Sequence, residues 1–259
     1  MPEYNRVVVR YENGLTEVKT YQYYQRYGYS VDKIDKKHQG LVSFKSDVKK
    51  HGRIKGKKDN FKEVNVYKNV HRAKSKIRQL CNNNGNLLTK FLTLTYADSF
   101  LEKDLSLSNQ IFSNFVKRIN YKYRKKFDGL EYLCVPELQQ TGRIHYHLLC
   151  NLPYIDVFEL ESIWGYGKVY ISKIDDINNL GAYLSSYVEK DFGKAFPGRK
   201  HFMKSKGVKY PVALKIDSEY DDSEYDVRKC TYYSEQYNSF CGKVETNVFS
   251  DKVVWKVKE

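Results

Sequence analysis

The sequence predicts an α+β fold, with an antiparallel central sheet and helices on one face. From about residue 90, β-branched and aromatic runs alternate with amphipathic stretches of helical period. Their order is strand, helix, strand, strand, helix, strand, and one more helix follows. Only a short turn separates the second and third strands, so they should pair as a hairpin. This succession indicates a ferredoxin-like core with N- and C-terminal additions.

The elements of the core follow from local signals. A helix is expected over 106–126, with apolar residues at helical spacing and Ser106 as its cap. Asp156 begins a short helix in a pattern like a capping box, and Gly165 ends it. A last helix should run from Asp176 through residue 190. Extended runs predict the strands, at residues 91–96, 130–138, 143–150 and 168–174.

The flanking regions carry weaker signals. The first residues and the last sixty or so are rich in β-branched and aromatic residues, whereas lysine and glycine punctuate the stretch between the N-terminal strands and the first helix. The expected elements are strands at 7–9 and 16–24 around an Asn13-Gly14 turn, an exposed basic loop over 32–60, a helix over 61–81, and strands at 227–233 and 244–255.

Composition excludes several classes of protein. Hydrophobic residues make up 41% of the 259 and charged residues 29%, which is typical of a globular chain rather than a disordered or membrane protein. No apolar run approaches the roughly 18 residues that span a bilayer. Residues 1–4 lack an apolar signal core, so we expect a cytoplasmic protein. Five cysteines without a C-x-x-C pair disfavour a disulfide framework or a cysteine zinc site.

Positive charge favours nucleic acid as the partner. The chain has 45 Lys and Arg against 31 Asp and Glu, a net charge of +14, beside 24 tyrosines and 13 phenylalanines. Such a surface can track phosphates while aromatic rings stack on bases. The alternative is a solvated basic face with no ligand. The residues expected to contact nucleic acid are Lys57, Lys58, Arg72, Lys74, Lys76 and Arg78.

Two histidines in one strand predict a metal site. Strand alternation puts His145 and His147 on the same face, about 7 Å apart at Cα. If the hairpin turn is centred near Thr141, Glu137 lies opposite His145 and points to that face. Two imidazoles and a carboxylate leave coordination positions open, and Mg²⁺ or Mn²⁺ is the expected ion. The alternatives are two exposed histidines, and a Glu137 that only pairs with Arg143.

Two tyrosines on the last helix form the second candidate cluster. Tyr183 and Tyr187 are four residues apart, so they share a helix face, and Lys190 should sit beside them. The chain contains four Y-x-x-x-Y pairs, so the spacing alone is a weak signal. The pair formed by Tyr183 and Tyr187 differs from the other three because it comes directly after the last expected strand of the sheet. A structural alternative is that Tyr183 packs between the helix and the sheet.

In order and spacing, these blocks resemble the HUH endonucleases, the replication initiators (Rep proteins) of rolling-circle plasmids and small single-stranded DNA phages. The resemblance covers about residues 88–192 and extends to a Trp-Gly-x-Gly motif at 164–167. It implies the HUH fold, which is ferredoxin/RRM-like. It also implies Glu137, His145 and His147 as metal ligands and Tyr187 as the nucleophile, with Tyr183 as a second nucleophile or helper and Lys190 favouring the phenolate.

The activity implied by this resemblance is a metal-dependent nicking and rejoining of single-stranded origin DNA, through a 5′-phosphotyrosine and a free 3′-hydroxyl. No G-x-x-x-x-G-K-[ST] loop is present, so a host helicase and polymerase would be partners in a bacterial cytoplasm. The alternatives are a relaxase or transposase of the same chemistry and a non-catalytic DNA-binding regulator. The expected regions are a basic DNA-binding part (1–87), the endonuclease core (88–195) and a β-rich extension packed on the core (196–259).

Overall fold

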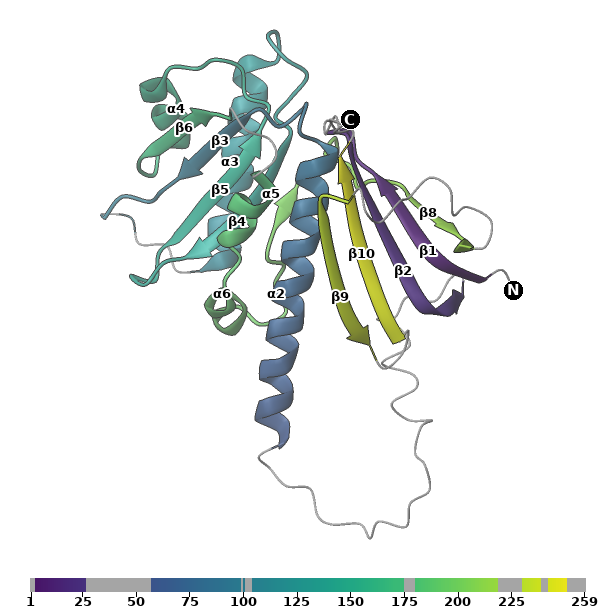
Figure 1. Cartoon of the computed structure of the whole chain (residues 1–259). Helices are drawn as coiled ribbons and strands as arrows, with labels where there is room; N and C mark the ends of the chain where they lie inside the picture. Colours follow the sequence, from purple (N-terminus) through teal and green to yellow (C-terminus); the bar gives the residue numbers. More distant parts are fainter. Residues whose placement is uncertain are drawn as a thin grey trace. The chain divides into compact units, whose positions relative to one another are not determined.

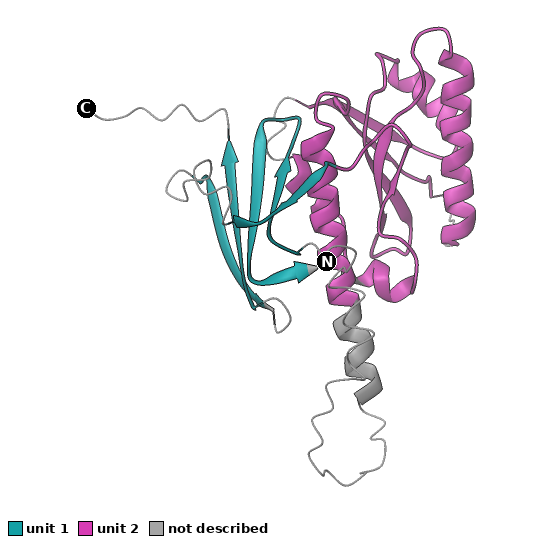
Figure 2. Ribbon diagram, turned by 90° about the vertical axis from the view of Figure 1, so that its right-hand side faces the viewer, with its two compact units in different colours: residues 1–55, 211–259 teal, residues 56–210 magenta. Residues whose placement is uncertain are grey.

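The computed structural model describes residues 3–26, 57–98, 100, 104–174, 180–218, 230–238 and 242–250 (Figure 1). The chain divides into two compact units, residues 1–55 with 211–259 and residues 56–210 (Figure 2). Strands from both ends of the chain share one sheet, and for this reason the units cut across the three regions expected from the sequence. Those regions stay predictions about function.

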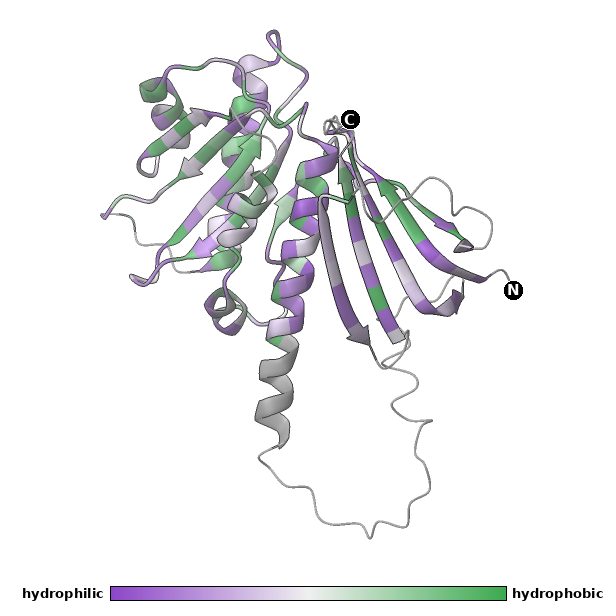
Figure 3. Ribbon diagram, in the orientation of Figure 1, coloured by the Kyte–Doolittle hydropathy of each residue, from purple (hydrophilic) through white to green (hydrophobic). Residues whose placement is uncertain are grey.

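The first unit contains a five-stranded antiparallel sheet in the order β8-β1-β2-β10-β9. The predicted hairpin around Asn13-Gly14 is confirmed, and Gly14 takes a positive φ of 85° at its turn. Figure 3 shows a continuous hydrophobic stretch on β1 and a largely hydrophilic β9. The C-terminal strands were predicted only in part: β9 extends past the expected 227–233 and β8 was not expected, while residues 227–229 and 251–255 lie outside the described residues. The strands are β1 (Glu3–Arg10), β2 (Leu15–Arg26), β8 (Ala213–Ile216), β9 (Tyr232–Asn238) and β10 (Gly242–Ser250).

The second unit contains another five-stranded antiparallel sheet, in the order β6-β3-β5-β4-β7. All four predicted core strands are present, each within two residues of its expected limits. The predicted hairpin register is also confirmed, since Glu137 pairs with His145. The sequence analysis missed the two-residue edge strand β7. The strands are β3 (Lys90–Leu94), β4 (Tyr132–Leu138), β5 (Ile144–Cys150), β6 (Val169–Lys173) and β7 (Met203–Lys204).

Helices cover both faces of this second sheet (Figure 2), so the expectation of helices on one face was wrong. One core joins Leu94, Tyr146 and Leu148 to α3 (Leu105–Tyr123) and α4 (Val157–Trp164). The other joins Leu133, Val135 and Leu149 to α2 (Lys57–Asn83) and α5 (Leu180–Ser186). The central strands bury apolar side chains on both faces, and each face therefore requires a covering layer.

The helix caps were predicted with mixed success. Asp104 caps α3 by accepting hydrogen bonds from the backbone N–H groups of Ser106 and Leu107, so the prediction of Ser106 as the cap was wrong. Ser106 already lies in the first turn, where its own N–H needs a partner. Asp156 caps α4, and Gly165 ends it in a left-handed conformation, as predicted. The N-terminal helix α2 begins at Lys57, so residues 57–60 are helical rather than part of the expected loop, whose other residues, up to 56, lie outside the described residues.

The last predicted helix does not run unbroken to Lys190. It ends at Ser186, Tyr187 lies in a turn, and α6 (Lys190–Ala195) begins after an extended Glu189. The hydroxyls of Ser185 and Ser186 donate to the carbonyls of residues 182 and 183. These bonds compete with the helical ladder and favour its end. The expected cap Asp176 lies outside the described residues.

Candidate metal centre and tyrosine pair

Three side chains from one hairpin converge as the sequence predicts. Glu137 on β4 and His145 and His147 on β5 each offer a ligand atom, and these atoms lie within 4.8 Å of one another. The closest pair is His147 Nε2 and Glu137 Oε2, at 2.7 Å. His147 is buried, whereas the other two side chains are half-buried. Two imidazoles and a carboxylate in this arrangement can hold one divalent cation.

Thr93 orients the buried histidine. It pairs with His147 across β3 and β5, and its hydroxyl lies 3.3 Å from Nδ1 of the imidazole. This contact leaves Nε2 facing Glu137. Metal-binding histidines generally have such a partner on the second nitrogen, because it fixes the ring and its tautomer. Residues 91–96 were predicted as a strand, but no local pattern indicated the contact of Thr93 with His147.

Electrostatics favour the protonation states that ligands need. The hydrogen bond from His147, aided by the charges of both histidines, lowers the pKa of Glu137 below its ordinary value although burial opposes this. Burial, and then the nearby His147, lower the pKa of His145. At neutral pH the carboxylate is therefore ionised and the imidazole of His145 neutral, and these are the forms that bind a cation.

The alternative partner for Glu137 is occupied elsewhere. Arg143, just before β5, makes an ion pair with Asp98 at 2.5 Å. Glu137 instead contacts His147. The hypothesis that Glu137 only balances Arg143 across the hairpin is thus wrong.

Both tyrosines lie beside this centre. The ring of Tyr187 stacks on His147 with centroids 3.6 Å apart and planes at 14°. Its hydroxyl donates to the hydroxyl of Tyr183 at 2.7 Å. Tyr183 is half exposed and meets Phe91 of β3 edge-on, with centroids 5.0 Å apart. Tyr187 therefore contacts His147, one of the candidate metal-binding side chains, directly. Tyr183 reaches His147 only through Tyr187 and Phe91.

The surroundings of Tyr187 keep its phenol protonated. Burial, the hydrogen bond with Tyr183 and the negative charge of Glu137 raise its pKa above the ordinary value. The expected help from Lys190 is not tested, since the side chain of Lys190 lies outside the described residues. The break after α5 also removes the shared helix on which that expectation rested.

The basic residues of α2 are not among the side chains of the candidate metal cluster. Arg72, Lys76 and Arg78 are exposed and Lys74 is half-buried, while the opposite side of the helix packs into the core. The backbone of Lys57 and Lys58 is helical, and their side chains lie outside the described residues. The structure does not test their role in DNA binding.

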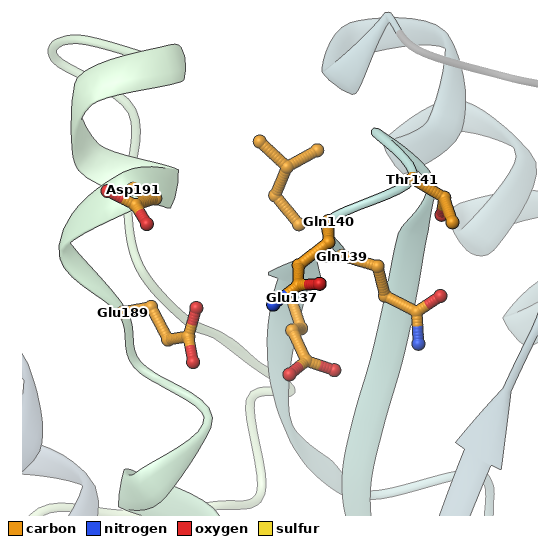
Figure 4. A pocket seen from close by; sticks show the side chains of 7 residues that line it. Glu137, Gln139, Gln140, Thr141, Glu189 and Asp191 are labelled. Carbon is orange, nitrogen blue, oxygen red and sulfur yellow. The ribbon is translucent and has the colours of Figure 1, made fainter.

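A cavity of about 620 Å³ adjoins the cluster at Glu137 (Figure 4). Its other lining residues come from the β4–β5 turn and from the start of α6. No local sequence pattern predicts this cavity, because the two segments are about fifty residues apart. The lining residues are Glu137, Leu138, Gln139, Gln140, Thr141, Glu189 and Asp191.

Comparison with known families gives a match within the second unit. Residues 89–192 match the model of the family described as Replication-associated protein ORF2/G2P. This segment belongs to that family. The matched range contains all three candidate ligands and both tyrosines, and it confirms the expected resemblance to rolling-circle Rep proteins. No curated protein and no solved structure matches the chain. Among the described residues, no helix is long and apolar enough to cross a membrane.

Proposed function

We propose that this Rep-family protein initiates rolling-circle replication by nicking and rejoining single-stranded origin DNA, with Tyr187 as the nucleophile. The observation that carries the proposal is the stack of Tyr187 on His147, within a segment of the Rep family. It places a phenol against a cluster of metal-binding side chains. A tyrosine alone or a cluster of metal-binding side chains alone would not indicate strand transfer. Their contact would bring a nucleophile to a centre that can hold a phosphate.

The three side chains fit a divalent cation. Their ligand atoms lie within 4.8 Å of one another, and the set leaves room for oxygen ligands. Mg²⁺ or Mn²⁺ is the ion we propose, because phosphate oxygens and water complete its preferred shell. Bound there, such an ion would act as a Lewis acid on a non-bridging phosphate oxygen and offset the charge of Glu137.

The protein's own residues would carry the transfer. The phenolic oxygen of Tyr187 forms a bond to phosphorus, the bond to the 3′-oxygen breaks, and that oxygen takes a proton to become the 3′-hydroxyl. The phenolic proton can leave through the 2.7 Å hydrogen bond to Tyr183, which is half exposed to solvent. Rejoining reverses these steps and needs no ATP, because the phosphotyrosine bond replaces the phosphodiester. Tyr183 is a helper in this scheme or a second nucleophile.

The basic residues of α2 would hold the DNA backbone. Exposed Arg72, Lys76 and Arg78 present positive charge along one helix, a surface suited to phosphate contacts. Such contacts position the strand without reading its sequence. A host helicase would supply unwinding, and a host polymerase would extend the 3′-hydroxyl.

Incubation of the full chain with a stem-loop oligonucleotide and Mn²⁺, followed by a denaturing gel, tests the function. A covalent adduct is expected with the unchanged protein and with Tyr154→Phe, a control at a tyrosine that is 89% exposed and outside the candidate metal cluster. Tyr187→Phe should abolish the adduct and retain DNA binding. If no divalent cation supports an adduct with any stem-loop, the protein is a DNA-binding regulator instead.

A further inference from the structure

The cavity beside Glu137 combines features that suit a nucleobase. Its volume of about 620 Å³ lies within the range of about 300–1,000 Å³ found for small-molecule sites. Figure 4 shows Glu189 and Asp191 on one side and the β4–β5 turn on the other. Glu137 belongs both to this cavity and to the candidate metal cluster. A group bound here would therefore lie next to a phosphate held by the cluster.

The lining is polar and lacks a described cation. Three carboxylates, two glutamine amides and a threonine face a cavity in a chain whose net charge is +14. Such a lining disfavours a phosphate and favours a neutral group rich in hydrogen-bond donors. Among the described residues, no hydrogen bond engages the side chains of Gln139, Gln140 or Glu189, and all three line the cavity. Asp191 is engaged more loosely, in an exposed ion pair with Lys194 at 3.6 Å.

We infer that this cavity binds the base of a nucleotide next to the scissile phosphate and selects bases that carry an exocyclic amino group. Carboxylates accept from cytosine N4, and a glutamine amide can pair with the N6 and N7 of adenine. Thymine has no amino group, so it offers the carboxylates fewer hydrogen-bond donors than cytosine or adenine does. Glu189 and Gln140 are then specificity-determining residues. This inference rests on the proposed function, and it adds where and how a base is read.

The alternative occupant of the cavity beside Glu137 is a second cation. Among the described residues, only Glu137, His145 and His147 bring three metal-binding side chains together, and neither Glu189 nor Asp191 joins that group. The glutamine amides and the volume of the cavity also exceed what one ion needs. A nucleobase therefore accounts for more of the lining than a cation does.

The test measures binding of the full chain to (dC)10, (dA)10 and (dT)10 by fluorescence anisotropy in EDTA. The unchanged protein should bind the amino-bearing strands at least about fivefold more tightly than (dT)10, the low end of what one bidentate base contact discriminates. Glu189→Gln and Gln140→Ala should each bring this ratio below about two. Asp128→Asn is the matched control, because it removes one exposed carboxylate outside the cavity and should leave the ratio unchanged.

The measured quantity is the ratio of affinities for the amino-bearing strands and for (dT)10. Glu189→Gln and Asp128→Asn each remove a negative charge. That loss of charge by itself strengthens binding to every strand alike and so leaves this ratio unaffected. Equal affinity for all three strands, or a ratio that survives both substitutions, overturns the inference and leaves the adduct assay unaffected. Absence of binding to any of the three strands also overturns the inference, and the stem-loop adduct assay with Mn²⁺ then decides the proposed function separately. Mn²⁺ titration separates the competing occupant: two ions per chain that fall to one in Glu189→Gln would assign the cavity to a cation and overturn the base site.

Discussion

The imidazole of His147 lies flat against the phenol of Tyr187, with ring centroids 3.6 Å apart. On its other sides the same imidazole contacts Glu137 and Thr93. One buried histidine thus links a carboxylate, a threonine hydroxyl and a tyrosine from three other segments of the chain. Any change in its position moves the candidate metal site and the candidate nucleophile together.

Thr93→Val should weaken Mn²⁺ binding about tenfold, because outer partners of metal-binding histidines typically contribute this much. Valine keeps the shape of threonine but cannot bond to His147 Nδ1. Isothermal titration calorimetry with Mn²⁺ measures the effect. Thr95→Val is the control, since the Thr95 hydroxyl donates to the carbonyl of Lys168 and not to a ligand. Equal affinities in the two variants would show that Thr93 does not orient the histidine.

Glu137→Gln should reduce Mn²⁺ affinity more strongly than Thr93→Val, because it removes the only negative ligand of the cluster. The amide keeps the size of the side chain, so the free energy of unfolding should change by about 1 kcal/mol or less. Calorimetry gives the affinity and urea denaturation the stability. Unchanged Mn²⁺ binding would place the cation elsewhere.

Gly167→Ala should destabilise the second unit by about 3 kcal/mol or more, because the new methyl group has no space. A Cβ at this position would lie 2.3 Å from the backbone oxygen of Thr95 and 2.5 Å from the nitrogen of Ala97. Gly198→Ala is the control. Both glycines have a positive φ, 79° at Gly198, but no atom lies within 4 Å of a Cβ built at Gly198. Gly198→Ala should therefore lower the free energy of unfolding by only about 1 kcal/mol. Equal midpoints in urea denaturation would contradict the close approach of these segments.

Cysteine reactivity should follow burial. Burial raises the pKa of Cys81 to about 12 and that of Cys150 to about 11, whereas Cys230 is only half-buried. A raised pKa means that the reactive thiolate is scarce below that pH, so alkylation of the two buried thiols at pH 8 should be slow in the folded protein. Mass spectrometry after a timed iodoacetamide reaction should find Cys230 modified before Cys81 and Cys150. Comparable rates at Cys81 would contradict the packing of α2 in its core.

The sequence predicted the parts of the site that depend on local periodicity. Strand alternation and the hairpin turn were enough to bring Glu137, His145 and His147 together. Local periodicity does not predict contacts between distant segments. The hydrogen bond of Thr93 to His147 and the cavity between the hairpin turn and α6 were therefore not predicted. The helix break at Tyr187 was missed because the serines before it read as ordinary helix residues, although their hydroxyls compete for the backbone carbonyls.

The helices on the second face of the sheet were missed for another reason. Leu133, Val135 and Leu149 alternate with equally apolar residues, and a strand that is apolar on both faces does not reveal what covers each one. The cap of α3 shows a similar limit. Asp104 and Ser106 both suit the position, and the backbone conformation of Asp104 decides between them.

Mass spectrometry of the peptide cross-linked to a cleaved oligonucleotide is the most direct test of the central claim. The account predicts a nucleotide attached to Tyr187, whose ring contacts the metal-binding histidine. Attachment to Tyr183 alone would reverse the roles of the two tyrosines. A cleaved strand with no covalent peptide would contradict nucleophilic catalysis by either of them.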